Sequence, residues 1–154
     1  MRTAIAAEPQ RVWRALTEPE ELVGWDPSRL AAIDPPDDYP SEGESMRWRY
    51  RLGSVQLVLH ELLEEIVPLH RLQSRLSLSS LRFEQTYSLA AETSDRDGPI
   101  TQVGLRLSAK NSVPVLGTVV DRFEVRRLAV ERVGEAIRSL QQWCEKSSPK
   151  APGS

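Results

Sequence analysis

Hydrophobic and polar residues alternate along the middle of the chain, which is typical of strands with one buried face. In MRWRYRL, residues 46–52, one face carries the apolar side chains and the other carries three arginines. Turn signals such as Pro68 and the DRDG sequence separate the alternating segments, which are 46–52, 55–67, 70–79, 82–90 and 100–109. We therefore predict five consecutive strands that pair as an antiparallel meander.

Helical spacing of apolar residues marks the C-terminal part of the chain. From 115 to about 146 the sequence contains no proline, and apolar residues recur at positions 119, 123, 130, 133, 137, 140 and 144. This pattern predicts one amphipathic helix of about 30 residues, roughly 45 Å long. We expect a single domain over 1–146, followed by a disordered tail at 147–154.

The N-terminal part predicts a strand, two short helices and a long loop. Residues 1–7 suit a strand, and Pro9 suits the first turn of a helix. We expect Thr17 to cap a second helix that carries Pro19 in its first turn. Residues 26–45 hold four prolines and six acids against one arginine, so we expect a loop with one helical turn at 28–32.

Composition narrows the class of protein. The chain has 154 residues and a formal net charge of −2, so no overall positive field favours nucleic acid or an anionic membrane. The longest mostly apolar tract, 55–67, contains charged residues and is too short to span a bilayer. A single cysteine, Cys144, and no recognisable leader favour a reducing, cytoplasmic setting.

Two phrases, one near the N-terminus and one at 64–73, resemble a known superfamily. In IAAEPQRVWRALTEPEELVGW the matching positions are Pro9, Val12, Trp13, Thr17, Pro19, Glu20 and Trp25, and in EEIVPLHRLQ they are Glu65, Pro68, Arg71 and Leu72. These phrases are similar to the START-like (SRPBCC) superfamily, in its bacterial polyketide cyclase/dehydrase and chaperone-ATPase-activator branches. The resemblance implies an α+β helix-grip fold, in which a curved antiparallel sheet of about six or seven strands wraps around the long C-terminal helix. The two short helices after the first strand would close the open end of that sheet.

The same resemblance implies a cavity between sheet and helix, which we expect to have a volume of about 300 Å³ or more. Our leading hypothesis is that this cavity binds a small apolar or aromatic molecule. One alternative is a polyketide cyclase/dehydrase-type enzyme that uses the same cavity, with a histidine moving protons. The other is a protein-interaction module of the chaperone-activator kind.

Strand parity and helical spacing predict which residues line the cavity. Aromatic residues interleaved with arginines can bind single-stranded nucleic acid, but the alternation in 46–52 puts rings and guanidinium groups on opposite faces. We expect Arg126 either to reach water past the apolar stripe or to face a ligand oxygen in the cavity. The resemblance alone places Trp25 near the mouth. The predicted ligand-binding residues are Trp25, Trp48, Tyr50, Phe83, Gln85, Tyr87, Phe123 and Arg126.

The sequence offers no motif for metal or nucleotide chemistry. His60 and His70 are the only histidines, and no acid or cysteine completes a ligand set at a typical spacing. Walker, G-x-G-x-x-G and G-x-S-x-G motifs are absent from the sequence. We therefore expect no metal and no cofactor, and we expect Cys144 to be a small buried side chain.

Overall fold

The computed structural model describes residues 1–52, 54–79, 81–94, 98–109 and 122–146. Within these ranges, the side chains of 93, 94, 122–126, 128 and 129 lie outside the description. The elements in chain order are β1 (Arg2–Ile5), α1 (Pro9–Thr17), α2 (Pro19–Trp25), β2 (Arg29–Ile33), β3 (Ser45–Leu52), β4 (Val55–Val67), β5 (Arg71–Leu78), β6 (Leu81–Ser94), β7 (Gly98–Ala109) and α3 (Arg122–Lys146).

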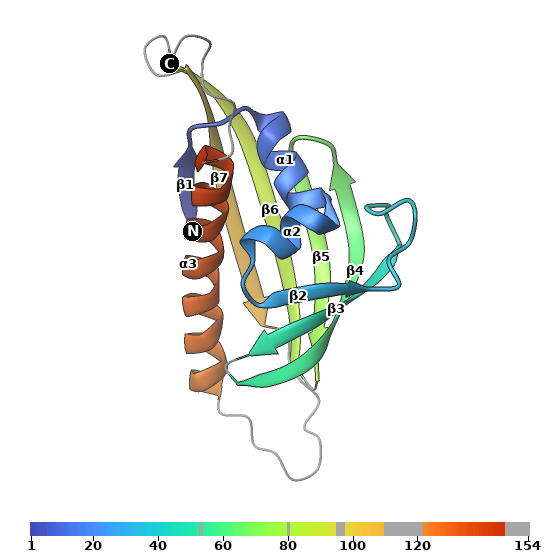
Figure 1. The fold of residues 1–154 in the computed structure, drawn as a ribbon. Helices are drawn as coiled ribbons and strands as arrows, with labels where there is room; N and C mark the ends of the chain where they lie inside the picture. The colour runs from blue at the N-terminus through green and yellow to red at the C-terminus, as the bar shows by residue number, and fades with distance from the viewer. Residues whose placement is uncertain (53, 80, 95–97, 110–121, 147–154) are drawn as a thin grey trace.

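The strands form one antiparallel sheet in the order β1-β7-β6-β5-β4-β3-β2. Each of the five strands of the meander pairs with its neighbour in sequence, because the short turns between them favour antiparallel pairing. Along β3 the burial alternates as predicted, with Met46, Trp48 and Tyr50 buried and the arginines exposed. The predicted helix-grip fold is confirmed (Figure 1).

One strand was not predicted. The expected helical turn at 28–32 is wrong, because Arg29–Ile33 form β2, which pairs with β3 from Arg29 opposite Tyr50 to Ile33 opposite Arg47. Without β2, the backbone groups along the outer edge of β3 would have no partner strand, and pairing outweighs the weak local preference for a turn.

The three helices cover one face of the sheet. Figure 1 shows α3 alongside β1 and β7, with α1 and α2 over the middle strands. Pro9 and Pro19 each occupy the first turn of a helix, where a missing N–H costs nothing. Thr17 does not cap α2, because it is the last residue of α1 and its hydroxyl donates to the carbonyl of Trp13 at 2.7 Å; Glu18 holds the capping position.

The C-terminal helix has a buried and an exposed side. Ile137, Leu140 and Cys144 are buried as the apolar stripe predicts, and Val133 is half-buried. Val130 departs from the prediction and is 62% exposed. The expected start of the helix at 115 and the expected tail at 147–154 lie outside the described residues.

Candidate functional site

A cavity lies between α3 and the sheet, with a volume of about 80 Å³. Most of its wall is aliphatic or aromatic, and polar groups gather where α2, β2 and α3 meet. The cavity is smaller than the expected 300 Å³. The lining residues are Asp26, Arg29, Tyr50, Leu52, Leu59, Leu76, Leu78, Leu81, Phe83, Gln85, Tyr87, Leu105, Leu107, Arg132, Val133 and Ala136.

Asp26 is placed at the polar end of the cavity by the end of α2. The indole of Trp25 donates to the carbonyl of Ala15 at 2.7 Å, which fixes α2 against α1. The next residue, Asp26, caps α2, and its carboxylate accepts a hydrogen bond from the backbone N–H of Ser28 at 3.0 Å. This local turn directs the chain into β2 and places the Asp26 carboxylate, 4% exposed, beside two arginines.

Arg29 is the first of these arginines and is held from three sides. Its Nε lies 3.2 Å from Asp26 Oδ2, its Nη2 lies 3.7 Å from Glu61 Oε2, and its guanidinium stacks 4.7 Å from the centre of the Trp48 ring. Glu61 in turn accepts hydrogen bonds from the Tyr39 hydroxyl at 2.8 Å and from the Trp48 indole at 3.4 Å. Arg29 is therefore held in one position in the wall of the cavity, where it is only 6% exposed.

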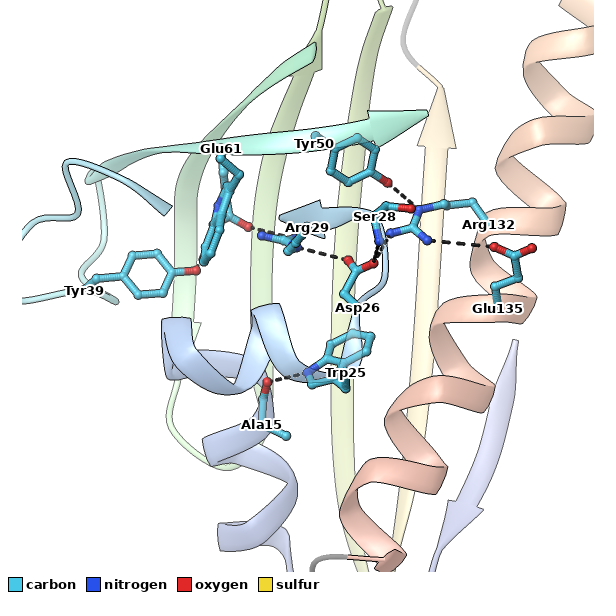
Figure 2. Close-up of polar contacts among 11 residues, drawn as sticks. Ala15, Trp25, Asp26, Ser28, Arg29, Tyr39, Tyr50, Glu61, Arg132 and Glu135 are labelled. Carbon is cyan, nitrogen blue, oxygen red and sulfur yellow. Dashed lines mark hydrogen bonds and ion pairs between the residues drawn. The ribbon is translucent and has the colours of Figure 1, made fainter. Parts of the chain in front are cut away.

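Arg132 brings the second positive charge from α3. Its Nη2 donates to Asp26 Oδ1 at 2.6 Å, and its Nε donates to the Tyr50 hydroxyl. The Asp26 carboxylate thus joins both arginines, and the contact ties α3 to β2 and β3 across the cavity (Figure 2). Glu135 lies at 4.0 Å from Arg132 but is largely exposed.

Four polar groups of the lining have no hydrogen-bond partner among the described residues. Nη1 of Arg29 and Nη1 of Arg132 are buried without one, and no hydrogen bond within the described part of the chain reaches the Tyr87 hydroxyl or the Gln85 amide. Tyr87 and Gln85 lie two residues apart on β6, so their side chains share the inner face of the sheet. A buried polar group without a partner costs about 1–3 kcal/mol. The cavity therefore has an unsatisfied polar end and an apolar body.

Burial keeps the two tyrosines of this region protonated. Burial raises the pKa of Tyr87, and the carboxylates of Asp26 and Glu61 raise it further, while the two arginines oppose the shift. Burial also raises the pKa of Tyr50, with Arg132 opposing. The Tyr87 phenol is consequently a hydrogen-bond donor at neutral pH and not a base.

The structure places the predicted site residues in three groups. Tyr50, Phe83, Gln85 and Tyr87 line the cavity. Trp25 and Trp48 are buried outside the lining, Trp25 against α1 and Trp48 behind Arg29. Phe123 and Arg126 belong to α3, but their side chains lie outside the described residues. Ligand binding by these residues stays a prediction.

The polar residues that sequence reasoning missed are Asp26, Arg29, Glu61 and Arg132. One feature of the sequence could have identified Arg29 as a site residue: it is the single arginine of the acidic 26–45 segment. No such feature marks Arg132, because it stands beside the apolar stripe of α3 rather than in it. Arg132 and Ala136 are four residues apart, so the cavity side of α3 is rotated from the side that contains Ile137 and Cys144.

The histidines lie away from the cavity. His60 is exposed between the buried residues Leu59 and Glu61 of β4, and His70 is exposed in the turn before β5. Neither histidine lines the cavity, so its geometry offers no histidine to move protons in the cyclase alternative. Among the described residues, no cluster of three or more metal-ligating side chains occurs. No helix in the described part of the chain has the length and apolar character to cross a membrane.

Fold and cavity together define the class of this protein. It is a helix-grip protein of the START-like (SRPBCC) superfamily. The chain belongs to the family described as "Polyketide cyclase / dehydrase and lipid transport", which it matches over residues 1–145. This membership and the fold support a ligand-binding or cyclase-type role.

Solved structures show the same fold at low sequence identity. A START superfamily protein from Mycobacterium smegmatis has a TM-score of 0.69 and 16% identity, over 96% of this chain and 97% of the other. A conserved protein from Geobacillus kaustophilus has a TM-score of 0.62 and 10% identity, over 95% and 93%. DynU16, from the dynemicin biosynthetic locus, has a TM-score of 0.61 and 18% identity, over 97% of this chain and 47% of its own. A comparison with curated protein sequences gave no match.

Proposed function

We propose that this protein binds a small apolar or aromatic molecule whose carbonyl or phenolic oxygen meets Arg29, Gln85 and Tyr87. The observation that carries the proposal is that an apolar cavity is lined by polar groups without hydrogen-bond partners among the described residues: Nη1 of Arg29, Nη1 of Arg132, the Tyr87 hydroxyl and the Gln85 amide. A ligand oxygen can accept from the Arg29 guanidinium and the Tyr87 hydroxyl, and the Gln85 amide can donate or accept. Cys144, the single cysteine of the chain, is consistent with a reducing, cytoplasmic setting.

The size of the cavity limits the ligand. A cavity of about 150 Å³ accommodates a benzene ring, and the cavity here has about 80 Å³. Entry of a ring therefore requires lining side chains to move. Leu81, Phe83 and Leu107 are half-buried and border the cavity, so they can move outward at little cost. A compact ligand of one ring fits these limits better than an extended chain.

A cyclase-type reaction in the same cavity is the second candidate. Arg29 and the protonated Tyr87 would favour it, because they can stabilise the negative charge that develops on a carbonyl oxygen. A free base is missing from the described lining, since its carboxylate, Asp26, is engaged with two arginines. Binding therefore has the stronger support.

The test compares ligands that differ in one oxygen. Acetophenone and ethylbenzene have similar shapes, and we expect calorimetry to show tighter binding of acetophenone. Tyr87→Phe should weaken the binding of acetophenone by about 0.5–1.5 kcal/mol, which is a factor of about 2 to 12 in the dissociation constant. The melting temperature of the variant should not decrease. Ethylbenzene affinity should not change. Thr86→Val is the matched control, because it removes a hydroxyl from the adjacent residue on the other face of β6.

Two results would contradict the proposal. One is equal affinity for acetophenone in the wild-type protein and in Tyr87→Phe. The other is a loss of stability in Tyr87→Phe with no effect on binding, which would make Tyr87 a packing residue rather than a ligand contact.

A further inference from the structure

At the polar end of the cavity, two positive charges of the lining are balanced by two negative charges, one in the lining and one behind it. Arg29 and Arg132 are paired with Asp26 and Glu61, at distances of 2.6 to 3.7 Å. Asp26, Arg29 and Glu61 are 4 to 6% exposed, and the Arg132 side chain is 18% exposed. We call these four residues the charge cluster. Its formal net charge is zero.

This balance decides which ligand oxygen the cavity accommodates. Burial of a carboxylate or phenolate costs several kcal/mol in lost hydration, and a net positive partner must offset that cost. Both guanidinium groups already have a carboxylate at close range, so an anionic ligand would add an uncompensated charge. A neutral carbonyl or phenol can accept from Nη1 of Arg29 without that cost.

Glu61 contributes to this balance from outside the cavity. It lies behind Arg29 and is absent from the lining. Tyr39 and Trp48 fix its Oε1, and its Oε2 faces the Arg29 guanidinium. Its negative charge therefore acts on the ligand through Arg29.

We propose that the cavity selects an uncharged carbonyl or phenol over a carboxylate or phenolate, and that Glu61 sets this selectivity as a positioning residue. The inference rests on the proposed function, since it concerns the ligand of the same cavity. Tyr87 supports it from within the protein: its phenol lines the cavity beside both arginines, yet its pKa is raised by burial and by the two carboxylates.

The first test compares benzamide with benzoate, which share a shape and differ in charge. At neutral pH the wild-type protein should bind benzamide at least about tenfold more tightly. Glu61→Gln keeps an oxygen for Tyr39 and Trp48 and leaves the cluster with one net positive charge. This variant should reduce the preference at least about tenfold or reverse it. Glu92→Gln is the matched control, because Glu92 is exposed and absent from the lining.

A second test measures the ionisation state of the bound ligand directly. 4-Nitrophenol changes its absorbance on ionisation, and a tenfold preference for its neutral form raises its pKa on binding by about one unit. The wild-type protein should raise the pKa of bound 4-nitrophenol, and Glu61→Gln should lower it relative to wild type. A purely structural contribution of Glu61 would weaken both forms equally and leave this pKa unchanged.

The outcomes separate the two proposals. If acetophenone binds but benzoate matches benzamide in the wild-type protein, the selectivity is wrong and the proposed function stands. If the wild-type preference appears but Glu61→Gln leaves it unchanged, Glu61 does not set it. If Glu61→Gln does not fold, the wild-type ratio and the pKa of bound 4-nitrophenol decide the selectivity. If no probe binds, both proposals fail.

Discussion

Asp26→Asn removes the negative charge that joins the two arginines of the charge cluster. The substitution keeps the side-chain shape, and the remaining oxygen can still accept from the Ser28 N–H. Arg29 and Arg132 lose the carboxylate that lies 3.2 and 2.6 Å away. The change therefore isolates the contribution of charge from that of packing.

The expected cost follows from burial and from the remaining partners. Loss of one partner of a buried ion pair costs about 3–5 kcal/mol. Arg29 keeps Glu61 at 3.7 Å, and the partly exposed Arg132 can turn toward water. We therefore expect Asp26→Asn to lower the free energy of unfolding by about 3 kcal/mol, the lower end of this range. For a domain of this size, that corresponds to a decrease in melting temperature of about 6–12 °C.

Urea unfolding followed by tryptophan fluorescence measures this free energy, since Trp25 and Trp48 are buried. Asp34→Asn is the control: Asp34 also pairs with an arginine, but its side chain is 90% exposed, so a change within about 0.5 kcal/mol is expected. Arg132→Met should cost less in the Asp26→Asn background than in wild type, by about 1–3 kcal/mol. Additive effects of Arg132→Met and Asp26→Asn would refute the conclusion that the ion pair between these residues stabilises the fold. A cost of Asp26→Asn below about 1 kcal/mol would refute it as well.

Two further predictions concern groups with shifted pKa values. Burial raises the pKa of all three tyrosines, Tyr39, Tyr50 and Tyr87, so their contribution to the free energy of unfolding is complete below their ordinary pKa of about 10 and declines as the pH rises above it. An absorbance titration should show phenolate only near or beyond the onset of alkaline unfolding, and phenolate in the folded protein at about pH 10 would contradict this. Burial also raises the pKa of Cys144 to about 11, so a thiol reagent should label the folded protein slowly at neutral pH and the urea-unfolded protein quickly; equal rates would contradict the placement.

Strand parity made the sheet predictable from the sequence. Alternation is a local signal, and it identified Tyr50, Phe83, Gln85 and Tyr87 as residues of the inner face. β2 escaped prediction because its short sequence lacks alternation and its strand conformation depends on pairing with β3. The same limit applies to the volume of the cavity, because the space between two layers depends on how their side chains interdigitate.

The charge cluster was not predictable in the same way. Asp26 and Arg132 are 106 residues apart, and nothing near either of them indicates the other. Buried charges become recognisable only when partners from distant segments are seen together, as with Glu61 from β4 and Arg29 from β2. Amphipathic periodicity describes which side of a helix is apolar, and it does not show where a polar residue of that helix meets a cavity.

The lining divides by structural element, which has a consequence for redesign of the protein. The charged groups come from α2, β2 and α3, whereas the aliphatic wall of Leu76, Leu78, Leu105 and Leu107 comes from β5 and β7. A library of substitutions confined to these leucines can reshape the space available to a ligand and leave the ion pairs intact. Ligand shape and oxygen recognition can thus be engineered as separate modules of one scaffold.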